Sequence, residues 1–111
     1  MIDALIAGRI YGKPSERTSN NGNYYAVAKV RVSVRDGEAY FVNVIAFDEA
    51  AIGALLALSD GDSVALSGEL TPKVYQPKEG PPRPSLDLLA HAVLTAYHVS
   101  RKRQAVTTDP E

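Results

Sequence analysis

The chain has 111 residues, a formal net charge of −1 at pH 7 and no cysteine. This length suits one domain with a single modest core, and the lack of cysteine excludes disulfides and thiol chemistry. A near-neutral charge argues against a polycation that binds any nucleic acid strongly. Because the N-terminus has no basic region and the longest apolar run, residues 50–58, is too short to cross a bilayer, we expect a cytoplasmic protein with no signal peptide and no membrane contact.

The first predicted element is a strand over residues 2–10 that continues, bent, toward Thr18. Gly8 and Gly12 offer places for sharp curvature in this strand. Residues 19–23, Ser-Asn-Asn-Gly-Asn, are typical of a turn.

Residues 24–47 predict one long β-hairpin with a basic outer face. Side chains alternate faces along a strand, so the apolar even-numbered positions of 24–34 can cover a core, while the odd-numbered positions from Lys29 onward face water. Asp36-Gly37 suits a tight turn. The return strand, residues 38–47, carries Tyr40, Phe41 and Phe47. Cations can follow a phosphate backbone while flat rings stack on unpaired bases; the alternative is a solvated strand whose aromatic side chains belong to the core.

A short helix is predicted next, with Asp48 as its N-cap and an apolar stripe within residues 52–58. Residues 59–62, Ser-Asp-Gly-Asp, should end the helix. Residues 64–70 then predict a fourth strand with a glycine inside it.

Residues 72–84 contain five of the seven prolines and a surplus of positive charge. Because proline cannot donate to a central ladder, we expect an extended excursion between strands here. Its candidate binding residues are Lys73, Tyr75, Lys78 and Arg83. Residues 86–98 predict the fifth strand, which closes a domain of residues 1–100, and residues 101–111 predict a disordered tail.

The predicted order of strand, strand, strand, helix, strand, strand is that of the OB-fold. The sequence therefore predicts an all-β protein, a five-stranded OB-fold barrel with one short helix between strands 3 and 4. In this fold the face of strands 2 and 3, with the loops joining strands 1–2 and 4–5, binds oligonucleotides or oligosaccharides.

Five blocks of the sequence resemble the bacterial single-stranded DNA-binding protein family. Leu-Ile-Ala-Gly-Arg-Ile at 5–10 resembles the family's hydrophobic-Gly-Asn-Leu strand, and Asn-Gly at 21–22 falls where the family has its Asn-Gly turn. Residues 40–47 resemble Glu-Trp-His-Arg-Val-Val-x-Phe, residues 61–70 resemble Gly-x-x-Val-x-Val-x-Gly-x-Leu, and residues 73–75 fall at the family's Arg-Lys-Trp. Together the blocks span about residues 4–100.

The resemblance implies that rings on strand 3 and on the 4–5 excursion stack on bases, and the matching positions are Phe41, Phe47 and Tyr75. For Phe47, beside the helix, core packing is the alternative. Asn43 and Glu49 replace two family cations, which implies the loss of two phosphate contacts. The family's acidic C-terminal tip ending in Pro-Phe recruits repair and replication partners; because this sequence ends Thr-Thr-Asp-Pro-Glu, we do not expect those partners.

We therefore expect non-sequence-specific binding of single-stranded DNA in replication, recombination or transfer of a mobile element. The candidate binding residues are Arg9, Tyr25, Lys29, Arg31, Arg35, Phe41, Asn43, Phe47, Lys73, Tyr75, Lys78 and Arg83. The resemblance also implies a homodimer or homotetramer, because first strands pair between subunits in the family.

Three alternatives remain open: an OB-fold protein like primosomal replication protein B that acts mainly through protein contacts, an adaptor that has lost nucleic-acid binding, and an RNA-binding protein, since stacking does not distinguish RNA. Catalysis is not expected. His91 and His98 are seven residues apart on a predicted strand and so face opposite ways, and no GxxxxGK[ST] loop is present. We expect no metal site and no cofactor.

Overall fold

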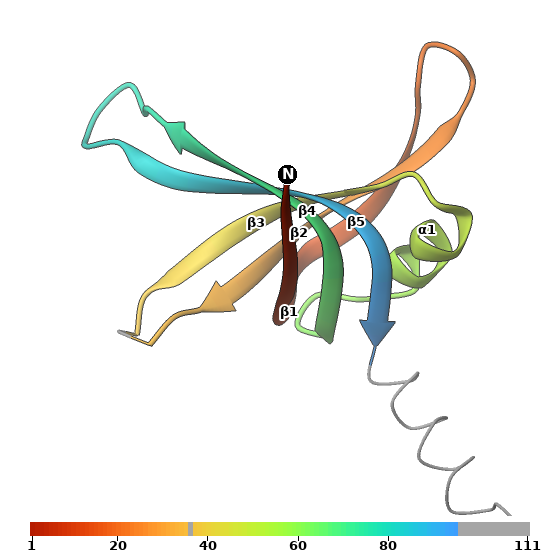
Figure 1. Ribbon diagram of the computed structural model, residues 1–111, viewed down its shortest axis with the longest axis horizontal. Helices are drawn as coiled ribbons and strands as arrows, with labels where there is room; N and C mark the ends of the chain where they lie inside the picture. Colours follow the sequence, from red (N-terminus) through yellow and green to blue (C-terminus); the bar gives the residue numbers. More distant parts are fainter. Residues whose placement is uncertain (36, 96–111) are drawn as a thin grey trace, which may run out of the picture.

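The computed structural model describes residues 1–35 and 37–95, which form five strands and one helix (Figure 1). In chain order these are β1 (Ile2–Thr18), β2 (Tyr24–Ser33), β3 (Ala39–Ala46), α1 (Glu49–Leu56), β4 (Ser63–Tyr75) and β5 (Arg83–Thr95). The strands close a barrel in the order β1-β2-β3-β5-β4, in which β3 and β5 are parallel and the other pairs are antiparallel. The predicted OB-fold is confirmed.

Alternating apolar side chains fill the barrel. Val30 of β2, Val42 of β3, Leu66 of β4 and Leu88 of β5 are completely buried. The even-numbered positions 26–32 of β2 therefore face the core, as predicted, and its cations Lys29 and Arg31 are left outside. The prediction is wrong for Tyr24, which is 62% exposed, because it lies before Ala26, where the pairing of β2 with β3 begins. Burying each of these aliphatic side chains contributes roughly 1.5–3 kcal/mol to folding.

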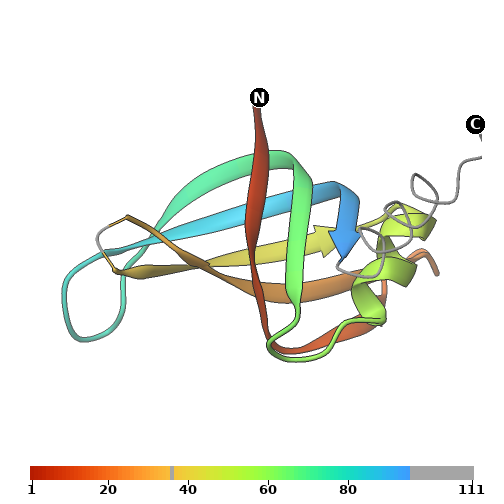
Figure 2. The same ribbon diagram turned by 90° about the horizontal axis from the view of Figure 1, so that it is seen from below.

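The helix α1 covers one end of the barrel. Asp48 is its N-cap, as predicted, because its carboxylate accepts a hydrogen bond of 3.2 Å from the backbone N–H of Ala51. Ala51 and Leu55 are buried, and the helix packs against β1, β2 and β5. Two β-hairpins project from the barrel at the end opposite α1 (Figures 1 and 2).

Glycines allow β1 to bend far enough to close the barrel. Its first half pairs with β4 and its second half with β2, and Arg9 has a register partner on both strands. A Cβ atom at Gly8 would lie 2.4 Å from the carbonyl oxygen of Arg31, so only glycine permits this crossing. Gly12 has a φ of +78° at an irregularity in the β1–β2 register. Of the two predicted points of curvature, Gly12 lies at this irregularity, and Gly8 lies where β1 passes closely over β2.

The first projecting hairpin is the β2–β3 arm, residues 32–41. Its turn was predicted at Asp36-Gly37. The N–H of Gly37 donates a hydrogen bond of 3.0 Å to the carbonyl of Val34, and Gly37 has a φ of +84°, whereas Asp36 is outside the described residues.

The second projecting hairpin is the β4–β5 arm, residues 71–85, and it corrects the sequence analysis. The prediction that residues 72–84 form an extended excursion between strands is wrong at both ends of this segment, because β4 continues to Tyr75 and pairs there with Arg83. Only residues 76–82 connect the two strands. Beyond Leu70 β4 has no partner on β1, and before Leu86 β5 has none on β3. Each strand of the arm therefore has a free edge, where a residue without an N–H is tolerated.

Several predictions fall outside residues 1–35 and 37–95. These are the end of the fifth strand at residue 98, the domain boundary at 100, the tail 101–111 and the position of His98. Within the described residues, no helix has the length and apolar character needed to cross a membrane.

Candidate nucleic-acid interface

The outer face of the barrel carries a row of side chains that crosses four strands. Tyr11 on β1 lies opposite Lys29 on β2, Lys29 opposite Asn43 on β3, and Asn43 opposite Asp87 on β5. Directly opposed residues in a sheet project to the same face. The next row along the strands contains Arg9, Arg31 and Phe41.

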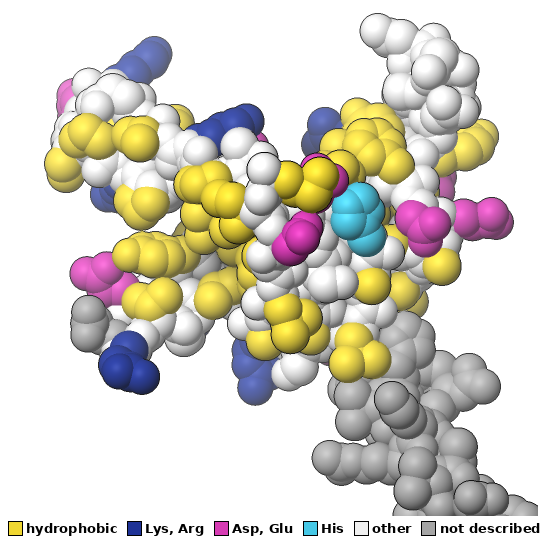
Figure 3. Space-filling view, in the orientation of Figure 1, with side chains coloured by type: hydrophobic (Ala, Val, Ile, Leu, Met, Phe, Trp, Pro, Cys, Tyr) yellow, Lys and Arg dark blue, Asp and Glu magenta, His cyan; other side chains and the backbone are white. Residues whose placement is uncertain are grey.

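The two arms enclose a hollow of about 880 Å³ that we call the arm cleft. Both arms contribute aromatic side chains to its lining, and basic side chains come from the β4–β5 arm and from β2. The lining residues are Lys29, Glu38, Ala39, Tyr40, Phe41, Asn43, Tyr75, Arg83, Pro84 and Ser85. Phe41 is 40% exposed and Tyr75 is 59% exposed, so neither ring belongs to the core. Figure 3 shows hydrophobic side chains gathered where the arms face each other.

A second hollow of about 630 Å³, the sheet cleft, lies over β1, β2 and β3. Its lining residues are Tyr11, Gly12, Lys13, Ser15, Arg17, Val27, Ala28, Lys29, Asn43, Val44, Ile45 and Asp87. Lys29 and Asn43 line both clefts. The two hollows therefore adjoin across the face of β2 and β3.

Contacts among the rings hold them in place while leaving much of their surface exposed. The rings of Tyr11 and Phe41 meet edge to face with centroids 5.0 Å apart, a favourable geometry for aromatic pairs. The Nζ of Lys29 lies 5.7 Å from the Phe41 centroid, within cation–π range. Tyr25 and Phe47 form a second pair at 5.6 Å. Phe47 is 56% exposed, so core packing is excluded for it.

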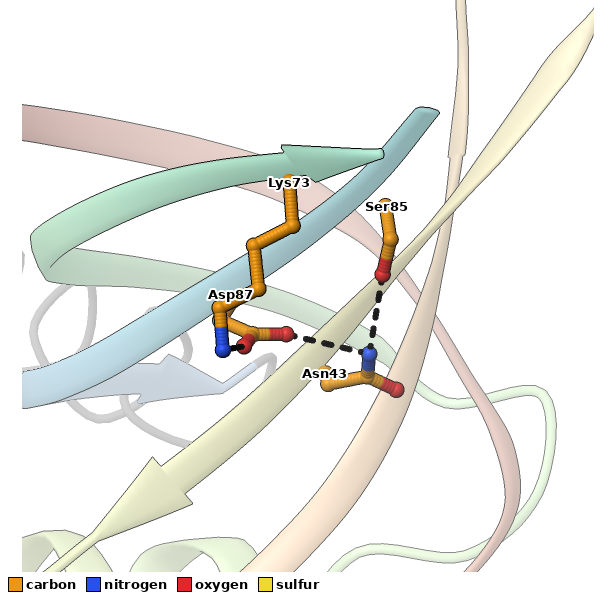
Figure 4. Close-up of polar contacts among 4 residues, drawn as sticks. All are labelled: Asn43, Lys73, Ser85 and Asp87. Atoms are coloured by element: carbon orange, nitrogen blue, oxygen red, sulfur yellow. Dashed lines mark hydrogen bonds and ion pairs between the residues drawn. The ribbon is translucent and has the colours of Figure 1, made fainter. Parts of the chain in front are cut away.

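A polar network joins the two clefts (Figure 4). Asp87 Oδ2 lies 2.7 Å from Lys73 Nζ, and Asp87 Oδ1 accepts a hydrogen bond of 3.1 Å from the side-chain amide of Asn43. The same amide donates to the Ser85 hydroxyl at 3.4 Å. The hydrogen bond from Lys73 lowers the pKa of Asp87 against the opposing effect of desolvation, and Asn43 lowers it further. Asp87 is therefore ionised at neutral pH.

The structure brings together some of the predicted binding residues but not all of them. Those lining the arm cleft are Lys29, Phe41, Asn43, Tyr75 and Arg83. Lys73 lies beside it, paired with Asp87. Arg9 is directed elsewhere, because its Nη1 donates a hydrogen bond of 3.0 Å to the carbonyl of Gly61. The remaining predicted residues line neither cleft, and these are Tyr25, Arg31, Arg35, Phe47 and Lys78.

Several residues of the clefts were not predicted as binding residues, among them Tyr11, Lys13, Arg17 and Asp87 in the sheet cleft and Tyr40 in the arm cleft. The alternation that places Arg9 outside would also have placed Tyr11 and Lys13 there, had it been applied to the predicted continuation of the first strand toward Thr18. No sequence pattern could have identified Asp87 as a cleft residue, because an acidic side chain does not suggest a phosphate-binding face. Within the described residues, no group of three or more His, Cys, Asp or Glu is placed to hold a metal ion.

Comparison with known proteins identifies the family. The sequence model of the Single-strand binding protein family matches residues 1–96, whereas no curated protein matches the chain. The small single-stranded DNA-binding protein from Streptomyces coelicolor is 26% identical with a TM-score of 0.70, covering 90% of this chain and 96% of that one. The mitochondrial single-stranded DNA binding protein Rim1 from S. cerevisiae has the same fold, at 23% identity and a TM-score of 0.66, covering 86% and 94%. Because the matched segment contains every described residue of the barrel, the chain belongs to the single-strand binding protein family.

Proposed function

We propose that this protein binds single-stranded DNA without strong sequence preference and keeps unpaired strands open during replication, recombination or transfer of a mobile element. The observation that carries this proposal is the arm cleft, in which the exposed rings of Phe41 and Tyr75 share one hollow with Lys29 and Arg83. Every base has a π-face, so rings of this kind bind single strands with little regard to sequence. Membership of the family supports the same function.

The adjoining clefts suggest the path of the strand. Bases would stack on Phe41 and Tyr75 in the arm cleft, and the backbone would pass Lys29 into the sheet cleft, where Lys13 and Arg17 offer further phosphate contacts. The remaining predicted residues, which line neither cleft, would act at the margins of this path: Arg9, Tyr25, Arg31, Arg35, Phe47 and Lys78.

We further propose that the protein acts by binding and not by catalysis, and that it does so in the cytoplasm. Residues 1–100 would form the binding domain, and residues 101–111 would form a tail. The family is one of binding proteins, and the clefts gather aromatic and basic groups suited to a nucleic-acid strand.

Titration with oligo-dT and with duplex of equal length tests the proposed function. Oligo-dT should bind clearly more tightly than the duplex, because paired bases hide their faces. Each phosphate contact in a single strand should add about −0.7 to the slope of log K against log salt, so binding measured by fluorescence anisotropy at two salt concentrations should weaken as salt rises. Equal affinity for both would contradict stacking, and tighter binding of oligo-rU would favour RNA as the ligand.

Self-association into a homodimer or homotetramer is also proposed. Leu5 on β1 is 77% exposed and Leu94 on β5 is 48% exposed, and small side chains lie between them, since Ala65 pairs with Ala7 on one side and with Leu94 on the other. A second copy would cover this apolar part of the outer face of β1, β4 and β5.

Light scattering at micromolar concentration should therefore show a dimer or tetramer, and Leu5→Glu should shift it toward the monomer by placing a charge in the interface. Val74→Glu is the matched control, because Val74 is equally exposed, at 75%, but lies on the β4–β5 arm. A wild-type monomer at these concentrations would refute self-association.

A further inference from the structure

Asp87 is the acidic residue of the sheet cleft, on a face that is rich in aromatic and basic side chains. It lines the sheet cleft beside Lys29 and Asn43, the two residues through which the sheet cleft adjoins the arm cleft. A carboxylate at this point repels a phosphate backbone and would by itself weaken binding of any nucleic acid.

The carboxylate is fixed more firmly than the cation it holds. One oxygen of Asp87 accepts from Asn43 on the neighbouring strand β3, and the other contacts Lys73 on the β4–β5 arm. The Asp87 side chain is 34% exposed, whereas that of Lys73 is 60% exposed. Lysine is a flexible point charge with three rotatable donors, so its ammonium group can turn to another anion while Asp87 stays in place.

Lys73 differs from the other cations of the face because it is paired with a carboxylate. In residues 1–35 and 37–95, the ion pairs are Lys73–Asp87 and a His91–Glu69 contact at 3.7 Å. Lys29, Arg31 and Arg83 thus have no carboxylate within ion-pair distance among the described residues. An incoming strand meets these three cations unpaired, but it must displace Asp87 to reach Lys73.

From this geometry we infer that Asp87 is an internal competitor for phosphate: it occupies Lys73 in the free protein, lowers affinity for the strand and assists its release by taking Lys73 back. The inference rests on the proposed function. An exposed ion pair of this kind is weak, so a phosphate can open it, and its effect on affinity should be moderate. Because affinity changes within one interface appear mainly in the dissociation rate, the competitor should act chiefly on release.

The test uses Asp87→Asn in the full chain, which removes the charge with almost no change of shape. We expect oligo-dT to bind roughly threefold to tenfold more tightly at low salt, with a similarly slower dissociation in stopped-flow measurements. We also expect the salt slope to steepen by about 0.7, since Lys73 becomes one more unpaired cation that releases a counterion. Melting curves of each variant establish that it is folded.

Two further variants separate competition from a general charge effect. Glu79→Gln removes the same charge from the exposed tip of the β4–β5 arm, which carries Lys73, and should leave affinity within about twofold of wild type. In a Lys73→Met background, Asp87→Asn should produce a smaller gain and no steeper salt slope. An equal gain in affinity in that background would overturn the inference, because Asp87 would then weaken binding only by repelling the phosphates and not by competing for Lys73.

The remaining outcomes are also decisive. Weaker binding by Asp87→Asn would show that the carboxylate positions Asn43 and Lys73 for contact with the strand, and this would overturn the inference. Unchanged affinity and dissociation would overturn it while leaving the proposed function intact. Failure of both wild type and variant to bind oligo-dT would overturn both.

Discussion

Replacing Phe41 or Tyr75 with alanine is expected to weaken oligo-dT binding by about one to two orders of magnitude in each case. Base–aromatic stacking is worth roughly 1–3 kcal/mol per base, and each substitution removes one exposed ring from the arm cleft. Isothermal titration calorimetry or anisotropy with oligo-dT measures this loss. The effect should be similar with mixed-sequence oligonucleotides, because stacking does not depend on base identity.

Stability should change far less than affinity. A buried Phe→Ala substitution costs roughly 3–5 kcal/mol, but Phe41 is 40% exposed and contacts Tyr11 only through an edge-to-face pair. We therefore expect the Phe41→Ala protein to lose about 1 kcal/mol of unfolding free energy and to remain folded.

Two control positions are more exposed than these rings and lie outside both clefts. Tyr24 on β2 is 62% exposed, and Val74 is the neighbour of Tyr75 on the opposite face of the β4–β5 arm. Tyr24→Ala and Val74→Ala should bind oligo-dT within about threefold of wild type. If the cleft substitutions unfold the protein while the folded fraction binds normally, the rings are structural and the site lies elsewhere.

Gly68→Ala is expected to destabilise the barrel by about 3 kcal/mol or more. A Cβ atom at this position would lie 1.9 Å from the carbonyl oxygen of Leu89 and 3.0 Å from the Cα of Ala90. These are backbone atoms, so no side-chain rotation relieves the clash and the two strands must separate. Overpacking in a core typically costs about 1–3 kcal/mol, and a clash with backbone belongs at the upper end or beyond.

Thermal unfolding should register this as a fall in Tm of about 12 °C or more, since a domain of this size loses about 4–8 °C per kcal/mol. Gly53→Ala provides the control. A Cβ at Gly53 meets nothing within 4 Å, and alanine in the interior of α1 should stabilise the helix by about 0.5–1 kcal/mol. A Gly68→Ala protein as stable as wild type would mean that β4 and β5 are not as close as described.

Local patterns in the sequence were enough for the order of the elements and most of their faces. The alternation of β2 predicted that Val30 is buried and Lys29 exposed, because side chains one residue apart must face opposite sides of a strand. Asp48 predicted the start of α1 because its carboxylate satisfies a free N–H at the helix end. Together these local rules predicted the OB-fold and, with the resemblance, the family.

The extent of β4 and β5 beyond residue 70 could not be predicted from local sequence patterns. The prolines at 72 and 84 argued against pairing, and that rule applies only where both edges of a strand are occupied. Whether β4 and β5 have a free edge depends on where β1 and β3 stop pairing. The position of these free edges is a property of the closed barrel. It allows the segment that was predicted as an excursion to pair as an arm, on which Tyr75 lies.

The sequence by itself determined which residues could bind a strand, since residue type and strand alternation decide which rings and cations are outside. Only the tertiary structure decided which of them act together. Closure of the barrel places Tyr11 against Phe41 and Tyr75 across a cleft from Phe41, it turns Arg9 to Gly61, and it pairs Lys73 with Asp87. These contacts join residues 14 to 52 positions apart, and their geometry depends on register and curvature that no local pattern encodes.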